Sequence, residues 1–229
     1  MNDTHNAILQ RLSPEEFSEF LNSSMLIDVH LRDSLIEPNK PIEFIDFVES
    51  GVISVVATAD NETVEVVTVG RAGMVGLPVV LGADTTICRY FCQVSGQSRR
   101  IPTSSFKELM AKLPKFAAYC MRYSYSLFEQ AGQNSACNRL HSIEERCAKW
   151  LLLTHDRVDK PEFDLTQEFL AQMLGVRRQS VNLAAGILQA AGIIRYSRGV
   201  IQILKRPELE DVSCECYQLI RKSFDAQLS

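Results

Sequence analysis

The sequence has 229 residues, of which 46% are hydrophobic and 23% charged, and its formal net charge is −4. This balance is ordinary for a globular protein and excludes wholesale disorder, while the length favours two domains. No apolar run approaches the ~20 residues that a membrane-spanning helix needs, and the first residues lack the pattern of a secretion signal. We therefore expect a cytoplasmic protein with no membrane partner.

The charge is distributed unevenly along the chain. Residues 1–60 hold 3 basic and 11 acidic side chains, a net of −8, whereas residues 161–206 hold 6 basic and 3 acidic side chains, a net of +3. The acidic average therefore hides a basic segment late in the chain, which is where a nucleic-acid-binding face would be sought.

The first half of the chain predicts a short helix followed by many short strands. Ser13, a proline and two glutamates are typical of a helix N-terminus, and the apolar spacing extends that helix over residues 14–25. β-Branched runs at 52–58 and 63–69, with a turn at 60–62, predict a hairpin. Closely spaced glycines indicate further short strands, a texture typical of a sandwich or jelly-roll barrel.

After these strands the pattern becomes helical. A long helix is predicted to begin at Pro114, and six of its residues recur at 4-3-4-3-4 spacing, which forms one stripe along a helix. Such a stripe packs either on the chain's own β-domain or against a second copy, and we interpret it as a dimer seam. The seam residues are Phe116, Cys120, Tyr123, Leu127, Gln130 and Asn134. A second helix is predicted over 141–157, ended by a loop at 156–161.

Residues 167–186 match the pattern of a helix-turn-helix. Ala171 is the small residue that two crossing helices need at their close approach, and Gly175 supplies the positive φ of the tight turn. The alternative is an ordinary pair of helices with a solvated arginine pair.

The second helix of this motif opens with two arginines, a glutamine and a serine. These side chains suit guanine, adenine and phosphate oxygen, respectively, when a helix enters the major groove. A hairpin over 192–204 follows, with Arg198 at its tip, where it could contact phosphate. The predicted DNA-binding residues are Thr166, Gln167, Arg177, Arg178, Gln179, Ser180, Asn182 and Arg198.

In its motifs the chain resembles the CRP/FNR family of bacterial transcription regulators. The resemblance rests on Phe-Val-Glu-Ser-Gly at 47–51, Val-Gly-Arg-Ala-Gly-Met-Val-Gly-Leu at 69–77, and the block at 165–199. It implies an α+β fold with an N-terminal β-roll (a cyclic-nucleotide-binding-like jelly roll), a long central dimerisation helix and a C-terminal winged helix-turn-helix. The expected boundaries are 1–112, 113–138 and 139–229.

The resemblance also implies a function. Such proteins act as homodimers on palindromic double-stranded promoter DNA and work with RNA polymerase, with Arg178 and Gln179 in base-reading positions and Ser180 at a phosphate. Members often carry Glu where this chain has Gln179 and Arg where it has Leu183, so a different operator is expected. The alternative is a small-molecule-binding regulatory module whose helix-turn-helix contacts protein; the arginine-rich opening favours DNA.

The effector is not apparent from the sequence. Cyclic-nucleotide binders of the family carry a Gly-Glu-Leu element and an Arg-Ser/Thr-Ala element, which hold the ribose and the cyclic phosphate. Here the first element aligns with Gly76, Leu77 and Pro78 and lacks the carboxylate, and the cation nearest to the second is Arg89. The sequence thus argues against cyclic AMP, and Gly76, Leu77 and Arg89 are the only candidate effector-binding residues.

No metal or cofactor is expected. The oxygen-sensing members hold an iron–sulfur cluster on N-terminal cysteines, but this chain has none before Cys88, and haem would have to use His30 or Cys88. Cys88 and Cys92 would lie ~13 Å apart on a strand, and Cys214 and Cys216 would diverge on a helix. We interpret the seven cysteines as reduced thiols, mostly small core residues; an exposed redox-sensing thiol is the alternative.

The sequence also lacks the motifs of common enzymes. It contains no nucleophile elbow, phosphate-binding loop or zinc-protease motif. His141 and His155 lie on predicted helices among ordinary polar residues, without a nucleophile or paired acid beside them. We therefore expect no catalytic residues and no enzymatic activity.

Overall fold

The computed structural model describes residues 2–60, 62–158 and 160–228. The chain divides into two compact units. The N-terminal unit contains the chain up to Val55, Val69–Phe128 and the end from Ser223; the C-terminal unit contains Val56–Thr68 and Glu129–Lys222. The predicted boundary after residue 138 differs from this division. The observed division falls between Phe128 and Glu129, within the predicted long helix, and it assigns Val56–Thr68, the end of the predicted hairpin, to the C-terminal unit.

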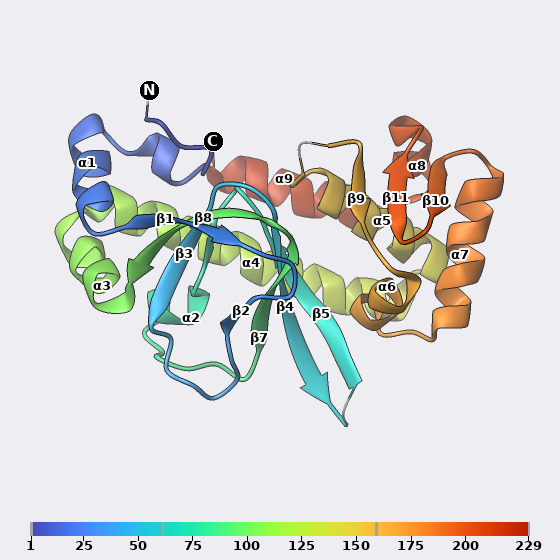
Figure 1. The fold of residues 1–229 in the computed structure, drawn as a ribbon, viewed down its shortest axis with the longest axis horizontal. Helices are drawn as coiled ribbons and strands as arrows, with labels where there is room; N and C mark the ends of the chain where they lie inside the picture. The colour runs from blue at the N-terminus through green and yellow to red at the C-terminus, as the bar shows by residue number, and fades with distance from the viewer. Residues whose placement is uncertain (1, 61, 159, 229) are drawn as a thin grey trace. The chain divides into compact units, whose positions relative to one another are not determined.

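Two four-stranded sheets form the predicted β-roll (Figure 1). One has the order β1-β8-β3-β6 and the other the order β2-β7-β4-β5. The strands are β1 Met25–Val29, β2 Ser34–Ile36, β3 Phe44–Val48, β4 Val52–Ala59, β5 Glu62–Val69, β6 Met74–Val75, β7 Arg89–Val94 and β8 Gly96–Pro102. The predicted hairpin is therefore β4–β5; of its predicted turn, Asp60 has φ +50° and Asn61 lies outside the described residues.

Helices flank these strands at positions that the sequence largely predicts. The helix predicted over 14–25 is observed at Pro14–Asn22, and it begins with a full capping box in which Ser13 and Glu16 bond each other's backbone N–H. The helices of this part are η1 Leu9–Arg11, α1 Pro14–Asn22, α2 Leu77–Val80, α3 Thr103–Lys112 and α4 Pro114–Leu140.

A cluster of aromatic rings forms the centre of the N-terminal unit. Phe47 of β3 lies with its ring centroid 5.0 Å from Phe20, 6.3 Å from Phe106 and 5.7 Å from Phe116. All four side chains are essentially inaccessible to solvent. Burial of such rings and their edge-to-face packing fix α1, α3 and the start of α4 on this sheet.

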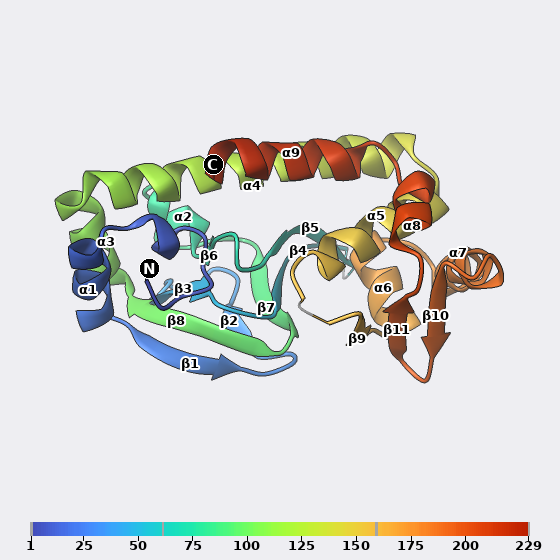
Figure 2. The ribbon, with the colours of Figure 1, turned by 90° about the horizontal axis from the view of Figure 1, so that it is seen from above.

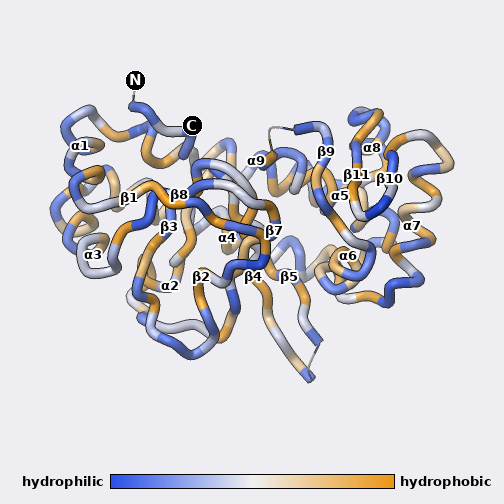
Figure 3. The backbone as a smooth tube through the Cα atoms, viewed as in Figure 1, coloured by the Kyte–Doolittle hydropathy of each residue, from blue (hydrophilic) through white to orange (hydrophobic). Residues whose placement is uncertain are grey.

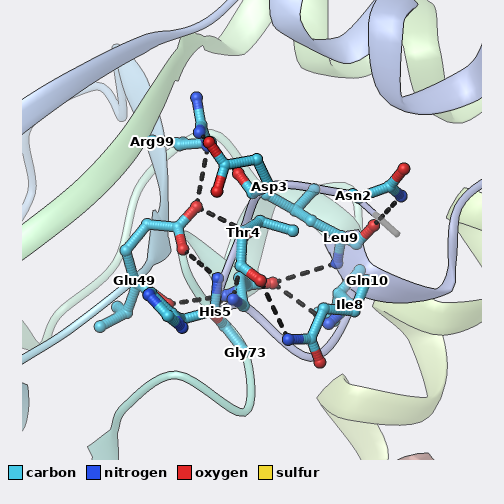
Figure 4. A network of polar contacts seen from close by, with 12 residues as sticks. Asn2, Asp3, Thr4, His5, Ile8, Leu9, Gln10, Glu49, Gly73 and Arg99 are labelled. Carbon is cyan, nitrogen blue, oxygen red and sulfur yellow. Dashed lines mark hydrogen bonds and ion pairs between the residues drawn. The ribbon is translucent and has the colours of Figure 1, made fainter. Parts of the chain in front are cut away.

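A buried carboxylate fixes the N-terminal segment to the same sheet (Figure 4). Glu49 accepts hydrogen bonds from the Thr4 hydroxyl at 2.7 Å, the His5 backbone N–H at 2.6 Å and Arg99 Nε at 2.8 Å. Arg99 also donates to the Asp3 carbonyl at 3.0 Å. Because the charge of Glu49 is both paired and hydrogen-bonded, its burial is tolerated. The 47–51 motif of the sequence is therefore a structural one.

The dimer-seam interpretation of the α4 stripe was wrong. Phe116, Cys120, Tyr123, Leu127 and Gln130 are at most 2% exposed within a single chain, so they have no surface to offer a second copy. The half-buried Asn134 donates to the Val66 carbonyl, and Gln130 donates to the Thr68 hydroxyl. Both polar members of the stripe thus donate to strand β5 of the same chain, so the stripe packs on its own chain from end to end.

The C-terminal unit combines helices with a small sheet. Its sheet has the order β10-β11-β9, with antiparallel pairing throughout. The helix predicted over 141–157 spans Ile143–His155 and begins with a second capping box, from Ser142 and Glu145. The elements are α5 Ile143–His155, β9 Glu162–Asp164, α6 Gln167–Leu174, α7 Arg178–Ala190, β10 Ile194–Ser197, β11 Val200–Ile203, α8 Arg206–Val212 and α9 Cys216–Leu228, the last of which belongs to this unit up to Lys222.

Two further points concern the whole chain. In the predicted loop at 156–161, Asp159 lies outside the described residues. In the part of the chain that the structure describes, none of the helices combines the length and the apolar character needed to cross a membrane.

Helix α9 lies alongside the latter part of α4 (Figure 2), where Gln133 Nε2 donates to Cys216 Sγ at 3.1 Å.

Candidate nucleic-acid interface

The helix-turn-helix is formed by α6, a glycine turn and α7. Thr166 caps α6, its hydroxyl accepting from the Phe169 N–H at 3.1 Å. Gly175 ends the helix with φ +61°, and the Val176 N–H donates back to the Ala171 carbonyl at 3.0 Å. Ala171 is 4% exposed, as a small residue at a close approach should be. The roles predicted for Ala171 and Gly175 are confirmed.

Helix α7 has one buried face and one exposed face, with hydrophobic and hydrophilic residues interspersed along it (Figure 3). Val181, Ala184, Ala185 and Leu188 are buried at helical spacing. The opposite face begins with the side chains that the sequence predicts to contact DNA. This division leaves Arg178 and Gln179, at the start of α7, exposed to solvent.

That turn presents cations to solvent. Arg177 occupies the N-cap position, and Arg178 and Gln179 follow as exposed residues, while Ser180 is half-buried. Among the described residues, no carboxylate lies within ion-pair distance of Arg177 or Arg178. Two guanidinium groups thus remain available for an external anion or for base edges.

The β10–β11 hairpin adds another exposed arginine. Its tip, Arg198 and Gly199, has φ +52° and +80°, the two positive values that a tight hairpin turn requires. Tyr196 anchors the hairpin by donating its hydroxyl to the Leu165 carbonyl at 2.7 Å. Burial raises the pKa of Tyr196 to about 12, so this donor keeps its proton at neutral pH. The wing therefore holds Arg198 in a defined place.

A surface hollow of about 480 Å³ brings these parts together. Five of the eight predicted DNA-binding residues line it: Thr166, Gln167, Arg178, Asn182 and Arg198. Within it, Gln167 Nε2 donates to Asn182 Oδ1 at 3.0 Å, which links the start of α6 to α7. Gln189 and Tyr196 also line the hollow and are joined by a 2.8 Å bond from the Tyr196 N–H to the Gln189 side chain. The sequence analysis missed these two.

The end of the β4–β5 hairpin packs beside the helix-turn-helix, which the sequence did not predict. Trp150 Nε1 donates to Glu65 Oε1 at 2.8 Å, and a Cβ on Gly175 would come within 2.9 Å of the Val64 side chain. A second hollow, of about 700 Å³, lies here, and Arg177 is among its lining residues. No local signal could reveal this, because the contacting residues are about a hundred positions apart.

The candidate effector residues lie on different sheets. Gly76 and Leu77 follow β6, where Gly76 has φ +111° and caps α2. Arg89 opens β7 of the other sheet, with its Nε 3.7 Å from Glu37 Oε1 and its guanidinium over the Phe91 ring. Arg89 is thus already engaged with a carboxylate of its own chain.

The prediction that Cys214 and Cys216 diverge on one helix was wrong. Helix α9 begins only at Cys216, and the extended backbone of Ser213 sets Cys214 in the connection from α8. Both thiols converge with Cys137 and His141, and all four potential ligand atoms lie within 4.8 Å of one another. Among the described residues, this group is the one that could hold a metal ion.

The comparisons with known proteins agree with this geometry. Residues 145–212 match the model of the Crp-like helix-turn-helix domain. Among curated proteins, no significant match was found.

Solved structures match over most of the chain. FixK2 from Bradyrhizobium japonicum is 15% identical, with 83% of this chain and 98% of that chain covered and a TM-score of 0.71. The c-di-GMP responsive global regulator CLP of Xanthomonas campestris is 16% identical (83% and 99% covered, TM-score 0.64). TTHA1359, a CRP/FNR family regulator from Thermus thermophilus, is 20% identical (82% and 98% covered, TM-score 0.60).

The described fold and site define a β-roll protein with a winged helix-turn-helix. The chain carries a Crp-like helix-turn-helix domain and has the fold of the CRP/FNR transcription regulators. The resemblance indicated by the sequence motifs is confirmed to this extent.

Proposed function

We propose that the protein is a homodimeric, sequence-specific DNA-binding regulator of transcription. The observation that carries the proposal is the free N-terminal turn of α7, in which Arg178 and Gln179 are exposed next to the wing residue Arg198. An arginine bonds two acceptors of guanine, and a glutamine pairs with adenine in the same way, so this turn can read two base pairs in the major groove.

The remaining residues of the site fit contacts to the DNA backbone. Arg198 projects from the rigid wing tip, and Thr166 and Gln167 sit at the N-terminus of α6, where free N–H groups favour an anion. Ser180 offers a hydroxyl to phosphate. Such contacts position the protein on the duplex, whereas Arg178 and Gln179 supply the sequence preference.

A second face of α4 supports the dimer. Met121, Tyr125 and Phe128 are 57%, 50% and 73% exposed and recur at 4-3 spacing, opposite the buried stripe. Large apolar side chains grouped on one helix face are typical of an interaction surface. A two-fold seam there would pair two copies of α7 with half-sites of a palindromic promoter site about 34 Å apart, one turn of DNA. RNA polymerase is the expected partner of such a complex.

Cyclic AMP is not the effector in this proposal. The Gly76–Pro78 segment lacks the carboxylate that would hold a ribose, and Arg89 pairs with Glu37.

The proposal is tested by binding to the DNA upstream of the protein's own gene, measured by gel shift. The intact protein should form a discrete complex that unlabelled random DNA does not compete away. Arg178→Ala should abolish this specific complex, because each half-site loses about 1–3 kcal/mol or more of binding free energy. Arg221→Ala, an exposed arginine of α9, is the matched control and should bind normally. If both variants bind as well as the unaltered protein, the helix-turn-helix does not read DNA and a protein partner must be sought.

A further inference from the structure

Four residues from distant parts of the sequence form a compact group in the C-terminal unit. Cys137, His141, Cys214 and Cys216 place their sulfur and imidazole nitrogen atoms within 4.8 Å of one another. Cys137 Sγ lies 3.5 Å from Cys214 Sγ, and Cys216 Sγ lies 3.5 Å from His141 Nδ1. The three cysteines are at most 4% exposed and His141 is half-buried.

These separations fit ligands around one tetrahedral ion. Zn–S bonds of about 2.3 Å and Zn–N bonds of about 2.0 Å place two sulfurs about 3.8 Å apart, and a sulfur and a nitrogen about 3.5 Å apart. In a four-iron cluster each thiolate ligates a different iron atom, and in a two-iron cluster the ligands form two pairs on different irons, so in both cases some ligands are separated by the width of the cluster. The close spacing here favours a single ion.

Local structure explains why the four atoms meet. Cys137 and His141 are four residues apart at the end of α4, and the His141 N–H still donates to the Cys137 carbonyl at 3.1 Å, so both side chains lie on one face. Cys214 and Cys216 can turn to the same side because the helix begins only at Cys216.

Two buried cations lie next to the group, and a buried negative charge would stabilise them. Lys149 and Arg146 of α5 are 5% and 7% exposed, and among the described residues no carboxylate lies within ion-pair distance of either. Lys149 bonds the neutral Asn134 amide and Arg146 the Leu174 carbonyl, and no described residue bonds Arg146 Nε. Uncompensated buried charges are costly. A divalent ion with three thiolates and a neutral imidazole has a net charge of −1, which would offset them in part.

The other buried cysteines of the chain are different. Burial raises the pKa of Cys147 to about 12, as expected for a thiol that serves as a small core residue. The three cysteines of the group instead lie with their sulfur atoms within 4.8 Å of one another and of a His141 ring nitrogen. Such a convergence of thiol and imidazole ligands suits a soft or borderline metal ion.

We propose that Cys137, His141, Cys214 and Cys216 bind one zinc ion. Three thiolates and an imidazole are a closed donor set, with no position left for substrate or water, so the site is structural. It ties the end of α4 to the α8–α9 connection and holds the start of α9 within the C-terminal unit.

The test is the metal content of the full-length protein, purified under reducing conditions without chelator. Mass spectrometry of the metals should find about one zinc per chain. Cys214→Ser and Cys216→Ser should each lower the zinc content severalfold. Cys88→Ser, at a half-buried cysteine of the N-terminal unit, is the matched control and should retain one zinc.

A second variant keeps the test decisive if the serine variants do not fold. His141→Cys supplies a fourth thiolate, so it should keep its metal. With Co²⁺ in place of zinc, its near-ultraviolet thiolate-to-cobalt absorption should rise by about one third relative to the unaltered protein, since four thiolates replace three.

Three results would overturn the proposal: protein without zinc that gives no thiolate band with Co²⁺; several irons with sulfide per chain; or a Cys137–Cys214 disulfide in protein kept free of oxygen. Because no DNA is used, the outcome is independent of the proposed DNA binding.

Discussion

At the scale of single residues, the two arginines of the proposed interface have different tasks. In the proposed function, Arg178 reads a base and Arg198, at the wing tip, contacts phosphate. We expect Arg198→Ala to weaken binding by a similar factor on operator and on unrelated DNA, because a phosphate contact carries no sequence information. Fluorescence anisotropy with both duplexes measures this. A loss confined to the operator would assign base reading to the wing.

Gly175 offers a test of the helix-turn-helix geometry. Its φ of +61° and the 2.9 Å approach to Val64 both disfavour a side chain, so Gly175→Ala should lower the free energy of unfolding by about 1–2 kcal/mol. Gly186 is the matched control: it lies inside α7 with open space around it, and Gly186→Ala should raise the free energy of unfolding by about 0.5–1 kcal/mol. Urea denaturation measures both free energies of unfolding. If the two substitutions changed them equally, the requirement for glycine at the turn between α6 and α7 would be contradicted.

Residues with local signals were predictable. Ser13, Thr166 and Gly175 act through neighbours three or four positions away, so the sequence pattern already contains their structural reason. The group around Cys137 was not predictable, because its members are up to 79 positions apart and because a two-residue difference in where α9 begins decides whether Cys214 and Cys216 diverge.

At the scale of elements, the length of α4 was predicted well, but the face of α4 that is buried within the chain was mistaken for the dimer seam. Two stripes with the same spacing run along this helix, and periodicity alone does not say which one faces the core. Polar Gln130 and Asn134 belong to the buried stripe, where they donate to Thr68 and Val66, whereas exposed Phe128 belongs to the other. Only the partner groups, far away in the sequence, distinguish the faces.

The exposed face of α4 is tested through the oligomeric state. Phe128→Asp should weaken the dimer at least a hundredfold, or about 3 kcal/mol, because a two-fold seam would bury two carboxylates together. Sedimentation velocity over a range of concentrations measures this. Ile87→Asp alters another exposed apolar side chain, 79% accessible, and should remain dimeric. A Phe128→Asp protein that dimerises normally would place the seam elsewhere.

The β4–β5 hairpin connects the two halves of the sequence. Its end belongs to the C-terminal unit through Glu65–Trp150 and Val66–Asn134, although its strands begin and end in the N-terminal unit. The hairpin itself was evident from its β-branched runs; its partner was not, since long-range packing has no sequence periodicity.

At the scale of the whole molecule, the net charge of −4 does not oppose DNA binding. The first 60 positions carry a net of −8, and the exposed arginines of α7 and the wing lie in a segment with a net of +3. The motifs and the composition of the sequence predicted a β-roll and, after it in the chain, a winged helix-turn-helix. The division into units did not, because it depends on contacts between distant segments.

The most direct test of DNA recognition by α7 and the wing is the salt dependence of operator binding. If the two copies together neutralise six to ten phosphates, affinity should fall roughly 10³–10⁵-fold between about 50 and 200 mM salt, because binding releases counterions. Arg198→Ala should make the slope of log affinity against log salt shallower by about 2 per dimer, one for each wing. An affinity that hardly changes with salt would contradict DNA binding by this surface.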